Sequence, residues 1–248
     1  MKTIDEVLHA LDEIIDQCIT DENPVGVFAA LYRTVTAEVK KGILNNRFAD
    51  GPRMEKLDVI FAKRFIDAWV AYSNNTPTTQ SWKIAFDSAR RSDLYPLQHI
   101  FLGMNAHINL DLGIAAAETA PSNSLLDLEN DFMEINVLLS EMTEVVQNKL
   151  GSISPIMAWL DRMAKNRDEQ IAGFSLVKAR DHAWNVANLL APIPTEEWGP
   201  VIDGVDQQIA KVGSLITKPS GILWRLAYRI INFFEHKPIV DVIKRLRN

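Results

Sequence analysis

The chain has 248 residues, of which 47% are hydrophobic and 23% charged, so it carries enough apolar material for a large core. Its net charge of −6 argues against general nucleic-acid binding, which needs a basic surface. A single cysteine, Cys18, excludes an internal disulfide, and the start Met1-Lys-Thr-Ile-Asp-Glu lacks the basic and apolar runs of a secretory signal. We therefore expect a cytoplasmic protein with no nucleic-acid partner.

Apolar residues recur at three- and four-residue spacing almost throughout, and alternating β-branched runs are missing, which predicts an all-α bundle of about ten helices with no β-sheet. Polar clusters, prolines and glycines delimit the helices. The expected ranges, in chain order, are 3–19, 24–45, 54–73, 79–91, 96–119, 125–150, 155–164, 168–190, 196–215, 219–234 and 238–246. In the first helix, Cys18 lies on the apolar stripe and is interpreted as a buried structural thiol.

The expected helix over 96–119 is apolar on nearly every face, so we predict that the other helices pack around it. The segment Ala191-Pro-Ile-Pro194 is the clearest break in the chain. We expect a main helical domain over 1–190 and a C-terminal helical appendage over 195–248. The appendage is predicted to pack on the main domain without forming an independent one.

The end of the chain is basic, because 222–248 holds six Lys or Arg residues against two acidic ones, a net charge of +4. Its apolar stretch, 222–234, is interrupted by Arg225 and Arg229 and is too short to cross a bilayer, so no transmembrane segment is expected. Two interpretations remain open. The segment either packs on the body, which we favour, or forms a helix that binds an anionic membrane surface or a protein partner.

The central helix carries four polar residues among apolar neighbours, namely Asn105, His107, Asn109 and Asp111. At about 100° per residue, His107 and Asp111 lie roughly 40° apart and one turn along the axis, so they can touch or share a ligand. Two interpretations fit this pair. It is either a hydrogen-bonded structural pair, which base rates favour, or part of a site for zinc, iron or manganese.

Asn105 and Asn109 form a second pair on nearly the opposite side of the helix, joined by Gln98. Their amides are suited to tying buried helices together, and with His99 they could also orient the polar end of a ligand. His99 is about 12 Å from His107 along a straight helix, too far to share one metal ion. Gly103, between these residues, indicates either close helix packing or a kink, and we favour close packing.

A metal site would need further ligands from other helices. The candidates are Glu38, Asp58, Asp67, Glu118 and His182. The alternative, purely structural interpretations are that Asp58 faces solvent, that Arg64 pairs with Asp67 along its own helix and that Arg180 stacks on Trp184. Glu129 and Asp131 are likewise interpreted as solvated acids.

Several catalytic signatures are missing from the chain. It has no phosphate-binding G-x-x-x-x-G-K-[ST] loop, no strand followed by G-x-G-x-x-G and no G-x-S-x-G elbow. Nucleotide-loop enzymes, dinucleotide dehydrogenases and standard serine hydrolases therefore lack support.

The segment Leu97–Leu112, which contains Asn-Ala-His-Ile-Asn-Leu-Asp-Leu, resembles an uncharacterised bacterial all-helical family of unknown function marked by an N-A-H-I-N-x-D-L helix. The upstream Phe61–Trp69 supports the likeness, and Arg180–Trp184 resembles a later signature, so the match spans roughly residues 5–190. The resemblance implies a shared helical fold with a buried polar helix, but no reaction. The H-x-x-x-D pair is also similar to one element of the helical zinc phospholipase and nuclease group, whose several-histidine ligand set this chain lacks.

Three functions are compatible with these patterns. The first is a metal-dependent hydrolase in which His107 and Asp111 hold a divalent ion that activates water. The second is a non-catalytic module that binds a small apolar or amphipathic ligand, with His99, Asn105 and Asn109 at its polar end. The third is a partner or membrane-surface binder that acts through 222–248.

Overall fold

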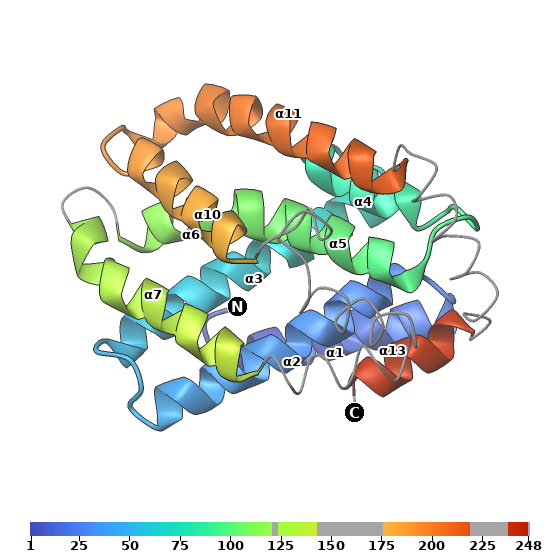
Figure 1. Ribbon diagram of the computed structural model, residues 1–248, viewed down its shortest axis with the longest axis horizontal. Coiled ribbons are helices and arrows are strands. Elements are labelled where there is room, and N and C mark those ends of the chain that lie inside the picture. The colour runs from blue at the N-terminus through green and yellow to red at the C-terminus, as the bar shows by residue number, and fades with distance from the viewer. Residues whose placement is uncertain (121–123, 143–175, 219–237, 248) are drawn as a thin grey trace, which may run out of the picture.

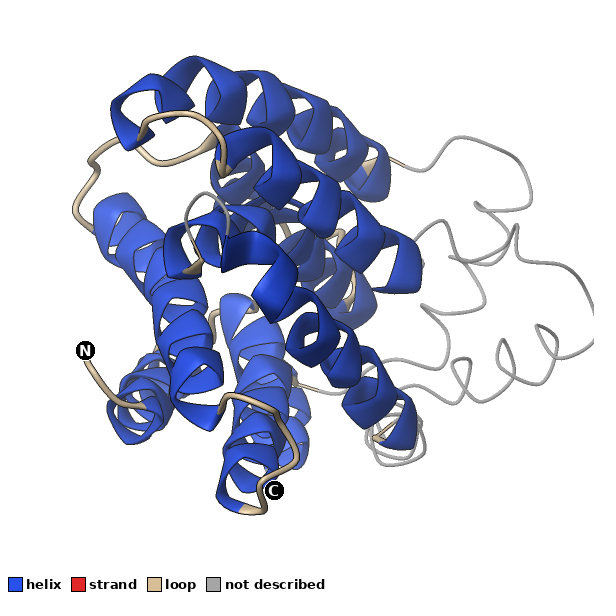
Figure 2. Ribbon diagram, turned by 90° about the vertical axis from the view of Figure 1, so that its left-hand side faces the viewer, coloured by secondary structure: helices blue, strands red, loops and turns tan. Residues whose placement is uncertain are grey.

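The computed structural model describes residues 1–120, 124–142, 176–218 and 238–247, and these residues form helices and no strands (Figure 2). The α-helices of the first half are α1 (Ile4–Thr20), α2 (Val25–Leu44), α3 (Gly51–Ser73), α4 (Gln80–Ser88), α5 (Pro96–Ala106) and α6 (Leu112–Thr119). They are followed by α7 (Leu125–Glu141), α10 (Leu176–Leu190), α11 (Trp198–Thr217) and α13 (Ile239–Arg247). The all-α prediction is confirmed. The helices expected at 155–164 and 219–234 lie outside the described residues.

The central element is the predicted 96–119 helix, which runs through the middle of the bundle (Figure 1). α11 lies on one side of it and α1 and α2 lie on the other, while α3 and α4 also pack against it. Within the described residues, this segment alone is long and apolar enough to cross a membrane. Because 78% of its most apolar window is buried inside the protein, we interpret it as the core helix of the bundle.

The central helix is not uniform, which the sequence did not predict. Residues His107–Asp111 form one turn of π-helix, in which the N–H of Leu112 donates to the carbonyl oxygen of His107. A π turn inserts one extra residue into the α-helical ladder and re-aims the side chains around it, and such turns are frequent at functional sites. The interruption therefore falls on the two residues whose pairing the sequence singled out.

Two glycines allow other helices to approach the central helix closely. A Cβ added at Gly103 would lie 2.3 Å from Cγ of Phe28 on α2, and one at Gly113 would lie 2.6 Å from the carbonyl oxygen of Ala183 on α10. Neither space could hold a methyl group without movement of the neighbour. The close-packing interpretation of Gly103 is confirmed.

α11 is fastened to the rest of the bundle by polar contacts. The carboxylate of Asp206 accepts hydrogen bonds from the backbone N–H groups of Gln80 and Ser81 at 2.6 and 3.0 Å. A side chain of α11 thus provides acceptors for the free N–H groups at the start of α4. Gln98 on α5 donates from Nε2 to the carbonyl oxygen of Ile216 at 2.7 Å. These bonds fix α11 against α4 and α5, next to the site described below.

The described part of the basic C-terminal segment packs on the body. α13 lies against α1 and α2 and buries Val242, Ile243 and Leu246. Its Arg247 pairs with Asp12 at 3.0 Å and with Asp16 at 2.5 Å on α1. The apolar stretch 222–234, on which the membrane and partner hypotheses depend, lies outside the described residues.

Replacing Gly103 with alanine is expected to destabilise the protein by about 1–3 kcal/mol, because the new methyl group would overlap the Phe28 ring. The matched control is Gly204→Ala in α11, where an added Cβ meets nothing within 4 Å. There the better helix propensity of alanine should stabilise the protein by up to about 1 kcal/mol. Urea unfolding of both variants measures the difference, and equal effects would contradict the close contact.

Candidate functional site

The carboxylate of Asp111 binds donors from three other positions in the bundle. Arg64 of α3 donates from Nε to Oδ1 at 2.9 Å, and Trp82 of α4 donates from Nε1 to Oδ2 at 2.8 Å. His107 lies one turn away, with Nδ1 3.2 Å from Oδ2. Asp111 and His107 are each only 1% exposed, so this cluster lies deep in the core. The predicted contact between His107 and Asp111 is confirmed.

Burial and the neighbouring charges together set the protonation states of Asp111 and His107. Burial alone would raise the pKa of Asp111, but the charge of Arg64 and the hydrogen bonds from His107 and Trp82 hold that pKa below its usual value. Burial lowers the pKa of His107, so the imidazole is neutral at pH 7. With an ionised carboxylate beside Nδ1, the neutral ring carries its proton on Nδ1, and this N–H donates a hydrogen bond to Asp111. Nε2 is left as a hydrogen-bond acceptor.

Aromatic rings hold the imidazole in place. The Phe61 ring stacks on His107 with a centroid distance of 3.6 Å and an interplanar angle of 7°. The Tyr32 ring meets it edge-on at 4.5 Å. Together with the bond to Asp111, these contacts fix the orientation of the ring and therefore the direction of Nε2.

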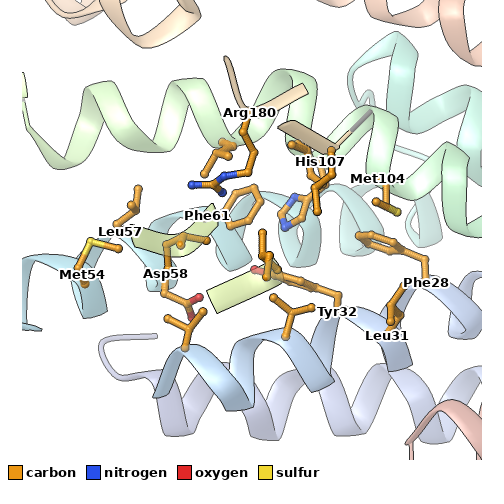
Figure 3. A pocket seen from close by; sticks show the side chains of 17 residues that line it. Phe28, Leu31, Tyr32, Met54, Leu57, Asp58, Phe61, Met104, His107 and Arg180 are labelled. Carbon is orange, nitrogen blue, oxygen red and sulfur yellow. The ribbon is translucent and has the colours of Figure 1, made fainter. Parts of the chain in front are cut away.

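An apolar cavity of about 120 Å³ lies beside His107 (Figure 3). It is lined by side chains of α2, α3, the central helix, α7 and α10. The described residues that line it are Phe28, Leu31, Tyr32, Val35, Val39, Met54, Leu57, Asp58, Phe61, Met104, His107, Ile108, Leu112, Ile135, Leu139, Leu176 and Arg180. Its volume is similar to that of an apolar protein cavity that binds a single benzene ring.

Three buried polar atoms at this cavity lack a hydrogen-bond partner among the described residues. They are Nε2 of His107, Oδ2 of Asp58 and the hydroxyl oxygen of Tyr32. Burial, followed by the charge of Glu55, raises the pKa of Asp58 to about 8, so its carboxyl group is mainly protonated at pH 7 and can donate. Burial also raises the pKa of Tyr32, and the nearby Thr36 hydroxyl only partly offsets that effect. Unpartnered buried polar atoms are costly, so their convergence on one cavity indicates a ligand site.

Arg180 enters the cavity from α10, opposite Tyr32 on α2 (Figure 3). Its Nε donates to Oδ1 of Asn136, and Nη2 donates to the carbonyl oxygen of Phe132 at 2.6 Å. The guanidinium carbon lies 4.4 Å from the centre of the Phe132 ring, so the expected stacking of Arg180 on Trp184 is wrong and Phe132 takes that place. Burial lowers the pKa of Arg180 to about 9, an effect that the charge of the neighbouring Asp181 only partly opposes, and no ion pair within the described parts of the chain involves Arg180.

The structure gives Asn105 and Asn109 contacts away from this cavity. Asn105 donates from Nδ2 to the carbonyl oxygen of Ile209 on α11 at 3.0 Å, and Asn109 donates to Oδ1 of Asn105 at 3.2 Å. Their predicted structural role is supported by these bonds, and neither residue lines the cavity. His99 is also buried and does not line it, and burial lowers its pKa to about 4. A ligand role for these three residues stays a prediction.

A metal ion held by His107 and Asp111 also stays a prediction. Both oxygens of Asp111 already accept N–H donors, one of them from a guanidinium group. In the described parts of the chain, no group of three or more His, Cys, Asp or Glu residues is arranged to hold a metal. Of the expected additional ligands, only Asp58 reaches the cavity; the others, which do not line it, are Glu38, Asp67, Glu118 and His182.

Four side-chain placements differ from the sequence-based interpretation. Arg64 pairs with Asp111, and Asp67 instead pairs with Lys63 one turn earlier. Asp58 is 7% exposed and Asp131 is 3% exposed, although both were interpreted as solvent-facing. Asp131 accepts hydrogen bonds from the backbone N–H groups of Ala49 and Asp50, just before α3. This contact joins residues far apart in the chain and has no signature in the sequence.

The roles of Tyr32, Phe61 and Trp82 were also missed. Their spacing on α2, α3 and α4 fits any buried helix face, so only the assembled fold shows that they meet at His107. The one local signal was the apolar setting of Asp58, between Leu57 and Val59.

Comparison with known proteins identifies a family but no activity. The model of a family described as "Family of unknown function (DUF5995)" matches residues 4–219, which is most of the chain. No curated protein and no solved structure matches the chain. The match includes the whole candidate site.

Replacing Asp111 with asparagine is expected to destabilise the protein by about 3–5 kcal/mol, because Arg64 loses its buried counter-charge. The matched control is Asp67→Asn on α3, where the exposed pair with Lys63 contributes less than about 0.5 kcal/mol. Urea unfolding at pH 7 measures both changes. Similar small effects in the two variants would show that the Asp111 cluster does not hold the core together.

Proposed function

Because the chain belongs to the DUF5995 family, whose description names no activity, we propose from its geometry that it binds a small amphipathic molecule in the cavity beside His107. The observation that carries the proposal is that three buried polar atoms without a partner among the described residues belong to side chains that line one cavity, whose other lining residues are apolar except for Arg180. Small-molecule sites typically combine an apolar lining with a few polar groups that fix the ligand's orientation. A cytoplasmic location is part of this proposal.

The three polar atoms offer complementary hydrogen bonds to a ligand. Nε2 of His107 accepts, whereas the protonated carboxyl group of Asp58 and the Tyr32 hydroxyl donate. A hydroxyl or carboxyl group on the ligand could use both kinds of partner. The ligand's apolar part would then contact aliphatic and aromatic side chains such as Leu31, Leu57 and Ile135.

The imidazole is prepared for this contact before any ligand arrives. Asp111 fixes its tautomer and Phe61 fixes its plane, so binding does not require the ring to reorient. A ligand hydroxyl can therefore donate to Nε2 without any cost for reorienting the imidazole.

The test uses 1-hexanol, whose size suits the cavity and whose hydroxyl can donate to His107. We expect saturable binding by calorimetry, and we expect Val35→Phe to weaken it at least about tenfold by filling the space. The control is Val212→Phe on the exposed face of α11, which should leave the affinity unchanged. Absence of saturable binding, or equal binding by the two variants, would contradict a ligand cavity.

A second candidate function is the hydrolase predicted from the sequence. The observation that favours it is the Asp111–His107 pair, in which a carboxylate orients an imidazole whose other nitrogen faces a cavity, as in many general bases. The metal-dependent version requires an ion to replace hydrogen bonds that Asp111 now makes to Arg64 or Trp82.

The metal-dependent version makes a separate prediction. Protein purified without a nickel column should carry about one equivalent of zinc, iron or manganese, and His107→Ala should lose it, because the imidazole would be a ligand. Elemental analysis of both proteins provides the measurement. A wild-type protein without stoichiometric metal would rule this version out and leave the binding proposal unaffected.

A further inference from the structure

The guanidinium group of Arg180 is the one positive charge among the described residues that line the cavity, because His107 is neutral. Arg180 is only 5% exposed, and its hydrogen-bond partners in the described part of the chain, Asn136 and the Phe132 carbonyl, are uncharged. A buried cation is expensive unless an anion compensates it. Two of its five N–H groups are used in these bonds, which leaves donors for a further acceptor.

The cavity also contains a carboxyl group that does not neutralise this charge. Asp58 on α3 lines the same cavity, yet no ion pair joins it to Arg180, and one of its oxygens has no partner. The two groups therefore face the cavity from different helices without meeting. An acceptor between them could receive hydrogen bonds from both.

We propose that the ligand of this cavity is a small apolar carboxylic acid whose carboxylate pairs with Arg180 and accepts a hydrogen bond from Asp58. This inference rests on the proposed binding function and names the chemical class of the ligand. Its apolar part is comparable in size to one aromatic ring or a short alkyl chain, as the cavity volume of about 120 Å³ requires.

The surrounding charges favour a monoanion over other head groups. An ammonium group would face the positive charge of Arg180 in a low-dielectric setting. A phosphate dianion would bring two negative charges to a single guanidinium group beside the carboxyl group of Asp58. A carboxylate matches the one available charge and the planar donors of arginine.

The ionisation of Asp58 gives the proposal a pH dependence. The titratable or charged groups around Asp58 are Glu55 on its own helix, Tyr32 on α2, His107 on the central helix and Arg180 on α10. Burial and the charge of Glu55 raise the pKa of Asp58 to about 8, so it changes from a donor to a negative charge as the pH rises through that value. Binding of a carboxylate should therefore weaken above pH 8, while binding of an alcohol should change less.

The experiment compares hexanoate with 1-hexanol by calorimetry on the full chain at pH 7. Wild-type protein should bind hexanoate at least about tenfold more tightly than 1-hexanol, a difference of about 1.4 kcal/mol. Arg180→Gln should remove this preference by weakening hexanoate about tenfold and changing 1-hexanol by less than about twofold. The matched control is Lys178→Gln, which removes an exposed charge from the same helix and should change neither affinity.

A second measurement does not depend on the folding of the Arg180 variant. Hexanoate affinity of the wild-type protein should fall between pH 7 and pH 8, and in Asp58→Asn it should stay nearly constant over this range, because asparagine does not titrate and Arg180, whose pKa is about 9, remains mainly charged. Binding of 1-hexanol without a preference for hexanoate would overturn the inference and leave the proposed function standing. Failure of both probes to bind the wild-type protein would overturn both.

Discussion

The structure depends on one buried carboxylate. Asp111 cannot remain charged in the core unless donors surround it, and those donors come from α3, α4 and the π turn of the central helix. The donors from α3 and α4 fix the positions of those two helices relative to the central one. The same bonds settle the tautomer of His107, so the residue that ties the helices together also prepares the acceptor at the cavity.

The central helix has two faces with different physical roles. On the α11 side, the amides of Gln98 and Asn105 bond to backbone carbonyl groups of α11 and so join that helix to the central one. On the opposite side, Nε2 of His107 and, from α3, Oδ2 of Asp58 have no partner among the described residues, and both side chains line an apolar cavity. The contrast between satisfied and unsatisfied polar groups, rather than the presence of polar residues, distinguishes the candidate site from the scaffold.

The sequence predicted that the chain is helical and that His107 and Asp111 share one face of the central helix, because both follow from a local repeat of about 3.6 residues. His107 and Asp111 are four residues apart in the sequence, so their contact was predictable for the same reason. The π turn was not predictable, because the local repeat does not mark it; in the fold it carries the carboxylate that Arg64 and Trp82 bind from other helices. The partners of Arg64 and Arg180, and the burial of Asp58, likewise depend on helices far away in the chain.

The arrangement of Arg180 and Asp58 supports the proposal that the cavity binds a ligand and is not a packing defect. Opposite charges in one apolar space lower their energy by pairing, yet the carbonyl of Phe132 and the amide of Asn136 hold Arg180 in place, and Asp58 remains mainly protonated instead. A core selected for stability alone would fill this space with apolar side chains, since buried ion pairs are often no better than hydrophobic packing. Holding a cation and a neutral acid apart on fixed helices costs stability, and it provides a preorganised pair of donors for an anion that enters between them.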